Sequence, residues 1–273
     1  MHIQIYIVSF LEVVFPLLAL VLLSRLHKYR FSAVIGGIAA YYLAADILMV
    51  LVTMLLSVMG MDETFWEEHL VASSVTNVVL NALFHDLTLY LVLRFTLKNR
   101  GRIYDAMALG ISYWLFSSIM NSIMNGYYAR IYQMAQAGRL SEMVNDSVTL
   151  EQLQLTLQDI TNAGTLNYYS QLVAIIAMSA VSAACCLFFY LSIKRQDLKT
   201  LLLTVAIHLG AMLLVNIPLF LDNSVFYLIT NVLALIAGSV VIWRFMLWYR
   251  EKQKALAYRK KNYQADLKSS SET

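Results

Sequence analysis

Seven long apolar segments constrain this chain more than any other feature of its sequence. They cover about residues 3–24, 31–59, 70–97, 103–124, 167–193, 198–221 and 225–248. A bilayer core is roughly 30 Å thick and takes about 20 helical residues to cross, so each segment is long enough to span a membrane. We therefore predict an all-α, polytopic integral membrane protein in which residues 1–250 form a bundle of seven transmembrane helices.

The composition excludes an ordinary soluble domain. Of the 273 residues, 60% are hydrophobic and only 14% are charged, and the mean hydropathy is +0.64. Soluble domains carry about 25% charged residues. The two cysteines, Cys185 and Cys186, are adjacent in an apolar run, where we expect them to pack as small side chains without forming a disulfide.

The distribution of basic residues predicts the orientation of the bundle. Of the twenty lysines and arginines, only Arg130 and Arg139 fall on one face, and the loop at 60–69 carries four carboxylates and no basic residue. Loops rich in Lys and Arg stay in the cytoplasm. Seven spans then place the N-terminus outside and the C-terminus in the cytoplasm.

Two segments outside the spans, the loop at 125–166 and the tail at 251–273, have sequence patterns that predict their local structure. Residues 125–166 form an extracytoplasmic loop in which Thr149 and Gln152 fit a helix capping box, followed by an apolar stripe from Leu150 to Ile160. We expect an amphipathic helix there. It lies on the bilayer surface or over the mouth of the bundle, or it is a packed connector with no role of its own. The cytoplasmic tail, residues 251–273, is basic and then Ser-rich, which predicts disorder and attraction to anionic headgroups.

Ionisable residues inside the spans mark the candidate site. An Asp at the centre of a transmembrane helix costs about 2.5–3.5 kcal/mol, so such residues usually face a protein interior or a cavity. In the third segment, Asn77, Asn81, His85 and Thr88 share one helical stripe, with Asp86 turned about 100° from it. Counting inward from the ends of the spans places Asp46, His85, Tyr113 and His208 at similar depth. We therefore predict one polar pocket near the midplane, to which Asn81, Asp86 and Asn121 also contribute.

Three chemistries fit that pocket. Imidazoles and carboxylates can hold a divalent metal such as zinc, the same groups can relay protons or bind an ion, and polar side chains can simply join helices together. The spans themselves do not decide among these. Nothing in the chain indicates nucleic-acid binding, because the topology already explains the basic tail.

The third and fourth segments resemble a known family. The run ALFHDLTLYLVLRFTLKNRGRIYDAMALGISYWLFSSIM at 82–120 is similar to the YhfC family of intramembrane metalloproteases, related to the CPBP group of CAAX-proteases and bacteriocin-processing enzymes. The similarity continues through YYSQLVAIIAMSAVSAACC and KTLLLTVAIHLGAMLL. The resemblance implies a seven-span fold in a bacterial plasma membrane, a metal held by histidines, and a glutamate that activates a metal-bound water.

The motif of this family is degraded here. Where the family has Glu-Glu-x-x-Arg, this chain has His85, Asp86 and Leu89, and the family's later histidines fall near Tyr113 and Met178. The resemblance leaves His208 as the one retained ligand position. Because adjacent helix positions diverge in direction, we also expect His85 and Asp86 not to reach one ion together.

We therefore expect a catalytically degenerate, pseudoenzyme-like protein that binds membrane partners or ligands and needs no cofactor. The alternative is an active, divergent metalloprotease in which His85 and His208 hold zinc and Asp86 is base or third ligand. A proton-coupled small transporter is the second alternative. The expected surroundings are the lipid bilayer and other membrane proteins.

Overall fold

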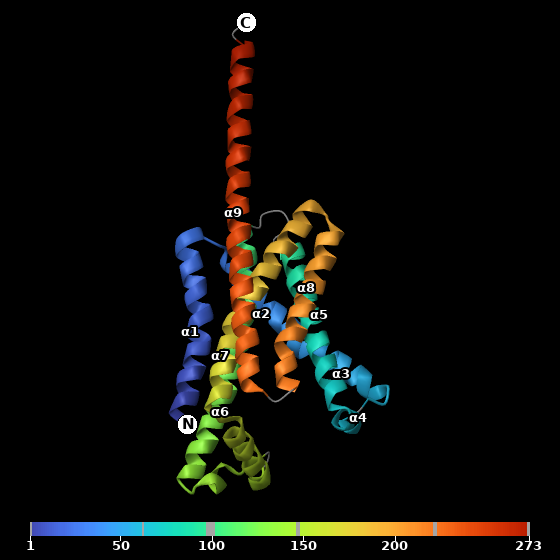
Figure 1. The fold of residues 1–273 in the computed structure, drawn as a ribbon, viewed down its shortest axis with the longest axis vertical. Helices are drawn as coiled ribbons and strands as arrows, with labels where there is room; N and C mark the ends of the chain where they lie inside the picture. The colour runs from blue at the N-terminus through green and yellow to red at the C-terminus, as the bar shows by residue number, and fades with distance from the viewer. Residues whose placement is uncertain (1, 62, 97–101, 146–147, 221–222, 272–273) are drawn as a thin grey trace.

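A computed structural model describes residues 2–61, 63–96, 102–145, 148–220 and 223–271. Within these ranges the chain is built from helices, and seven helical segments are long and apolar enough to cross a membrane. The predicted all-α, seven-span class is confirmed. The two termini lie at opposite ends of the bundle, as an odd number of spans requires (Figure 1). Which end faces the cytoplasm stays a prediction.

The bounds of the elements follow the apolar segments closely at most ends. One span is composite, because α2 runs through a π-helical turn, η1, into α3, and a short helix, α4, precedes α5. The elements are α1 (His2–His27), α2 (Phe31–Tyr42), η1 (Leu43–Leu48), α3 (Met49–Val58), α4 (Glu63–Glu68), α5 (Leu70–Thr96), α6 (Ile103–Gln136), the 3₁₀ turn η2 (Leu140–Met143), α7 (Leu150–Arg195), α8 (Leu198–Phe220) and α9 (Ser224–Ser271).

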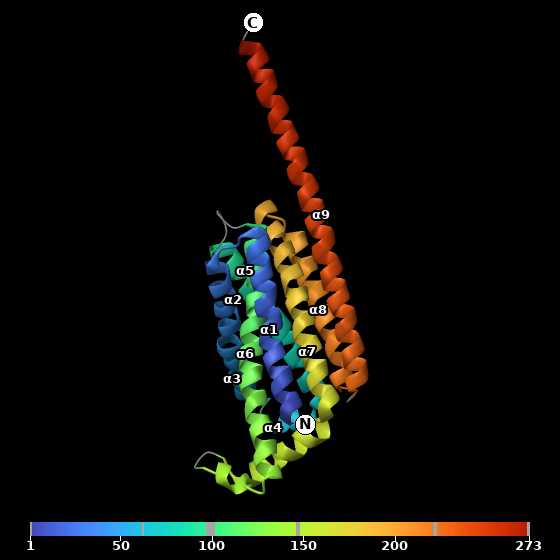
Figure 2. The ribbon, with the colours of Figure 1, turned by 90° about the vertical axis from the view of Figure 1, so that its left-hand side faces the viewer.

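Helices α6 and α7 form the centre of the bundle. Helix α6 packs against α1, α2 and α7, while α7 packs against α6, α8 and α9, and the side view shows α7 between α6 and α9 (Figure 2). The free thiols of Cys185 and Cys186 are buried on α7, as predicted. This arrangement leaves α5 and α8 in contact with each other and with α7.

Helices α6 and α7 approach closely at Gly110. A Cβ atom on Gly110 would lie 2.7 Å from the carbonyl oxygen of Ser182 and 2.8 Å from the backbone nitrogen of Ala183. Small residues let membrane helices pack backbone against backbone. Gly110 therefore fixes how near α7 comes to α6, and with it the position of Ser182.

The predicted loop at 125–166 is largely helical. Helix α6 runs on to Gln136, and α7 begins at Leu150 with the predicted capping box, in which Thr149 accepts from the backbone of Gln152 at 3.2 Å. The apolar stripe packs against α1 and α6, which buries Leu153 and Ile160. The segment turns into the bundle at Gly164. Its φ of 67° lies in the left-handed region, which glycine adopts without steric strain.

The tail differs from the disorder that the sequence predicts. Helix α9 continues without interruption to Ser271 and projects far beyond the other helices (Figures 1 and 2). The segment after Arg250 contains no Gly or Pro and is rich in Lys, Ala, Leu and Gln, which are strong helix formers. Local helix propensity thus explains the difference.

We expect Gly110→Ala to destabilise the protein and Gly126→Ala, on the same helix, to leave it as stable or slightly more so. The added methyl at Gly110 meets the α7 backbone, whereas nothing lies within 4 Å at Gly126. Overpacking costs about 1–3 kcal/mol. Thermal unfolding in detergent measures both; equal midpoints would contradict the close approach.

Candidate functional site

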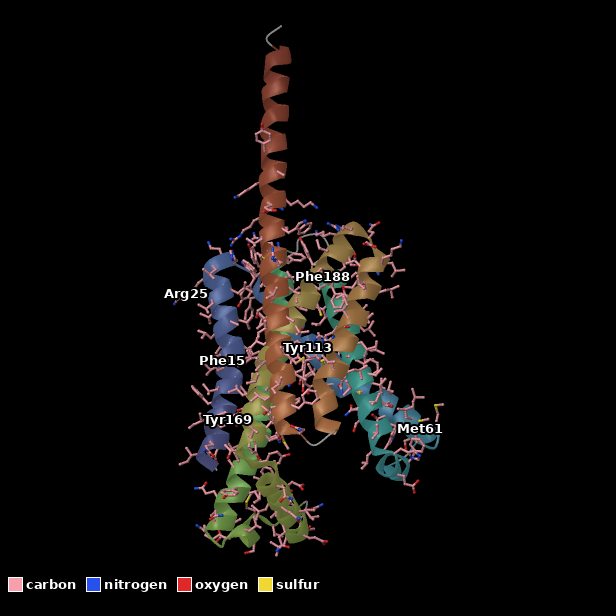
Figure 3. The ribbon with its side chains drawn as sticks, viewed as in Figure 1. Phe15, Arg25, Met61, Tyr113, Tyr169 and Phe188 are labelled. Atoms are coloured by element: carbon pink, nitrogen blue, oxygen red, sulfur yellow. The ribbon has the colours of Figure 1, made fainter. Side chains whose placement is uncertain are left out.

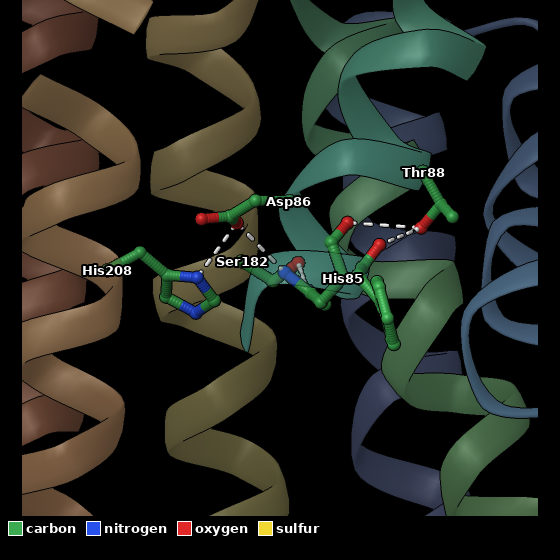
Figure 4. A network of polar contacts seen from close by, with 6 residues as sticks. His85, Asp86, Thr88, Ser182 and His208 are labelled. Carbon is green, nitrogen blue, oxygen red and sulfur yellow. Dashed lines mark hydrogen bonds and ion pairs between the residues drawn. The ribbon is translucent and has the colours of Figure 1, made fainter. Parts of the chain in front are cut away.

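Three ionisable side chains from two helices meet inside the bundle. His85 and Asp86 lie on α5 and His208 on α8. The Oδ1 atom of Asp86 lies 3.1 Å from Nδ1 of His85 and 2.8 Å from Nδ1 of His208 (Figure 4). One carboxylate oxygen therefore contacts both imidazoles, and we call these three residues the His–Asp cluster.

The expectation that His85 and Asp86 diverge is wrong. One potential ligand atom from each of the three cluster residues lies within 4.8 Å of the others. Although adjacent helix positions point about 100° apart, the His85 side chain turns back so that its Nδ1 meets the neighbouring carboxylate. Helical direction alone does not determine where a side chain with two rotatable bonds ends.

The cluster is sealed from the surroundings. His85 and Asp86 are each 2% exposed and His208 is 1% exposed. Buried charges are expensive unless they are paired and hydrogen-bonded. Ser182 on α7 supplies one more partner, with its Oγ 3.0 Å from Nε2 of His85, so α5, α7 and α8 are joined at one point.

Three atoms of the cluster make no hydrogen bond to a described residue: Oδ2 of Asp86 and both ring nitrogens of His208, of which Nδ1 still lies 2.8 Å from Oδ1 of Asp86 as a close polar contact. Buried polar atoms normally make at least one hydrogen bond, so a buried atom without one suggests a missing partner such as a bound ion or water. A neutral imidazole nitrogen and a carboxylate oxygen are both zinc ligands. With the contact between Asp86 and Nδ1 of His208, the pattern matches a carboxylate that orients a metal-binding histidine.

Aromatic rings close the cluster on the side of α6. Tyr113, at the centre of the bundle (Figure 3), sets its ring edge-on to His85 at 4.4 Å between centroids. Tyr41 on α2 contacts Tyr113 in turn at 5.3 Å, and the Trp114 ring lies 6.2 Å from His85. These rings exclude lipid and restrict the rotamer of His85.

The other predicted pocket residues lie away from the cluster. Asp46 is on η1, and Asp46, Asn81 and Asn121 all have exposed side chains. Asn81 bonds to Asn77 one turn earlier at 2.8 Å. None of the described interactions of these residues reaches the imidazoles. Tyr113 is the one further predicted pocket residue that contacts the cluster.

A buried carboxylate also lies elsewhere in the bundle. Glu12 on α1 is 0% exposed, and its Oε2 accepts a long hydrogen bond of 3.4 Å from Asn125 on α6. This pair joins α1 to α6 outside the His–Asp cluster.

Sequence patterns did not identify Ser182 or Trp114. Ser182 sits in a run of small residues typical of helix packing, and an isolated Trp in a span carries no chemical signal.

Asp197 fixes the start of α8, the helix that carries His208. Hydrogen bonds, above all that from Thr200, hold the pKa of the Asp197 carboxyl below its usual value.

Comparison with known proteins gives one match. A family model described as YhfC intramembrane metalloprotease matches residues 11–237, which is most of the chain. The matched region contains all three cluster residues. No curated protein and no solved structure matches the chain.

We expect Ser182→Ala to lower stability by about 1–3 kcal/mol, because it leaves a buried nitrogen of His85 without its partner. Ser179→Ala is the matched control, since the Ser179 hydroxyl donates to the Ile175 carbonyl within its own helix. Thermal unfolding compares the two. A larger loss in the Ser179 variant would exclude a structural role for the contact between Ser182 and His85.

Proposed function

The chain belongs to the YhfC intramembrane metalloprotease family, and on that premise we propose that it binds other membrane polypeptides without hydrolysing them. The supporting observation is the single carboxylate of the His–Asp cluster. Within the described part of the chain, Asp86 is the only acidic residue in contact with either imidazole.

Metal-assisted hydrolysis of a peptide bond needs two separate things from the protein. It needs a ligand set, usually of three side chains, and a general base within hydrogen-bond reach of the attacking water. If Asp86 is a ligand, no carboxylate is left as base. If Asp86 is the base, only His85 and His208 remain as ligands.

The donors of the cluster nevertheless fit a divalent ion. Two imidazoles and a carboxylate are a zinc ligand set, and the unpaired Nε2 of His208 and Oδ2 of Asp86 are available as ligand atoms. His85, Asp86 and His208 are the residues that would hold the ion. Such an ion, when bound, would polarise a carbonyl oxygen.

Binding without cleavage also agrees with the way the cluster is built. The imidazole of His85 is engaged at both nitrogens, by Asp86 and by Ser182. A histidine held on both sides cross-links helices, and His85 would have to give up one of these two contacts in order to ligate an ion. The cluster then serves as a rigid support for a bundle that other helices can contact.

The second candidate is an active, divergent metallopeptidase. The convergence of three potential ligand atoms within 4.8 Å favours it, because catalytic zinc sites commonly use three protein ligands and leave one position for water. The two candidates share the metal. They differ in whether peptide bonds break.

Cleavage can be tested without knowing a substrate. Cells that express the wild-type protein or Asp86→Asn are compared by mass spectrometry of the termini of all membrane polypeptides. We expect no new termini that depend on Asp86, because the cluster lacks a second carboxylate. Termini present with the wild type and absent with Asp86→Asn would establish the metallopeptidase instead.

Metal binding is tested separately. We expect purified wild-type protein to retain about one equivalent of zinc after dialysis, and His208→Ala to lose it, because Nε2 of His208 is an unpaired ligand atom. His69→Ala is the control, since His69 is an exposed residue bonded to Phe65. Elemental analysis gives the ratio; equal zinc in all three proteins would place the ion elsewhere.

A further inference from the structure

An apolar groove runs along the surface of the bundle between α1 and α9. Both helices pack on α7, which lies between them (Figure 2). The volume of the groove is about 330 Å³. Four helices line it, with Phe15, Leu18 and Leu22 from α1, Met107 from α6, Ala183 from α7 and Ile242 from α9. None of the lining residues belongs to the His–Asp cluster.

The lining of the groove is hydrocarbon with one exception. No charged side chain is among its described lining residues, and Ser179 is the one polar side chain there. The Ser179 hydroxyl already donates to the Ile175 carbonyl at 2.8 Å. The α1 wall is open to the surroundings, since Phe15 is 41% and Leu18 is 48% exposed. In a membrane the groove therefore faces lipid and favours an apolar occupant.

The shape of the groove favours a narrow occupant. It extends from Phe15 to Leu22 along α1 and from Leu235 to Ile242 along α9, which in each helix is about 10 Å at 1.5 Å per residue. A volume of about 330 Å³ over that length leaves a cross-section of roughly 30 Å². A helix that is 10–12 Å across covers roughly 80–110 Å². A transmembrane helix is therefore too wide for the groove, and a single extended acyl chain fits.

Cationic and aromatic side chains surround one end of the groove. There the His27 ring of α1 stacks on Tyr104 of α6 at 4.2 Å between centroids, and Tyr104 lies one turn before the lining residue Met107. Arg250 of α9 is near enough to Tyr104 to interact with it electrostatically. Arg25, near the same end of α1 (Figure 3), and Arg250 are both exposed. Two guanidinium groups on opposite walls therefore lie at the end of an apolar channel.

The acids near this end do not cancel the positive charge. Asp105 is 0% exposed, and its two carboxylate oxygens accept from the backbone N–H groups of Arg30 and Arg102 at 2.7 Å each. Glu251 is exposed, but on α9 it is turned about 180° from Ile242, which lines the groove. The end of the groove thus keeps an excess of positive charge.

We propose that the groove binds one anionic phospholipid, with an acyl chain between α1 and α9 and the phosphate at Arg25 and Arg250. Arg25 lies two helical turns beyond Leu18 on nearly the same side of α1, and guanidinium groups match the geometry of phosphate oxygens. Basic residues near a membrane surface attract anionic headgroups. A zwitterionic lipid carries an ammonium group that offsets its phosphate, so it gains less from two arginines. The bound lipid bridges α1 and α9 across the face of α7.

The test counts the lipids that the full-length protein retains. Delipidated protein in detergent is incubated with equal amounts of phosphatidylglycerol and phosphatidylcholine and measured by native mass spectrometry. We expect one phosphatidylglycerol to stay bound to the wild type, and Leu18→Trp to lose it because the larger side chain fills the groove. Leu17→Trp is the matched control, since Leu17 is equally exposed at 49% but is not among the lining residues.

A second pair of variants tests the headgroup contact. Arg250→Gln should bind phosphatidylglycerol roughly fivefold more weakly, the contribution of one basic residue near an anionic lipid, as measured by titration with the lipid. Arg244→Gln should bind as the wild type does. Arg244 is also exposed on α9, but it is turned about 160° from Ile242, and its guanidinium lies over the Trp243 ring.

Cross-linking tests the same site without a substitution. Phosphatidylglycerol with a photoreactive acyl chain should label wild-type peptides of α1 and α9, above all around Leu18 and Ile242. Unfolding midpoints show whether each variant is folded, and if Leu18→Trp is not, the cross-linked positions decide.

Three results would overturn the lipid site: equal retention of the two lipids, an equal loss of lipid in Leu17→Trp and Leu18→Trp, or labels spread evenly over the spans. If Leu18→Trp removed a co-purified polypeptide and left the lipid count unchanged, the groove would hold a partner helix, and the proposal would again be wrong.

Discussion

The contact of one carboxylate oxygen with two imidazoles determines much of this structure. In a bilayer interior an isolated charge is strongly disfavoured, so Asp86 must be met by partners from neighbouring helices. His85 on the same helix and His208 on α8 provide them at 3.1 and 2.8 Å. The requirement to satisfy this one acid brings α5 and α8 together and orients both rings.

Packing elsewhere holds those partners in place. Gly110 lets the α7 backbone approach α6, which positions Ser182 against His85, and Tyr113 covers the same imidazole from α6. Interhelical hydrogen bonds in membranes each contribute only about 0.6–2 kcal/mol. The cluster therefore depends on close backbone packing as much as on its own polar contacts.

The sequence predicted the seven spans well because length and hydropathy follow directly from the bilayer thickness. It also predicted the capping box at Thr149, which is a local pattern. The site was harder. Helical period brought Asn81 and His85 onto one stripe, yet Asn81 is exposed and His85 is buried, because rotamers and the tilt of neighbouring helices decide which polar groups meet. Ser182 could not be distinguished from the small residues around it.

Helix α9 has a consequence for electrostatics at the membrane surface. The apolar segment within it ends at Trp248, and the helix goes on to Ser271, which at 1.5 Å per residue is about 35 Å further along its axis. The field of anionic headgroups decays within about 8 Å at physiological ionic strength. A straight helix therefore lets only its first basic residues, such as Lys252, interact with lipid charge, while the far end of the helix lies beyond the reach of that field.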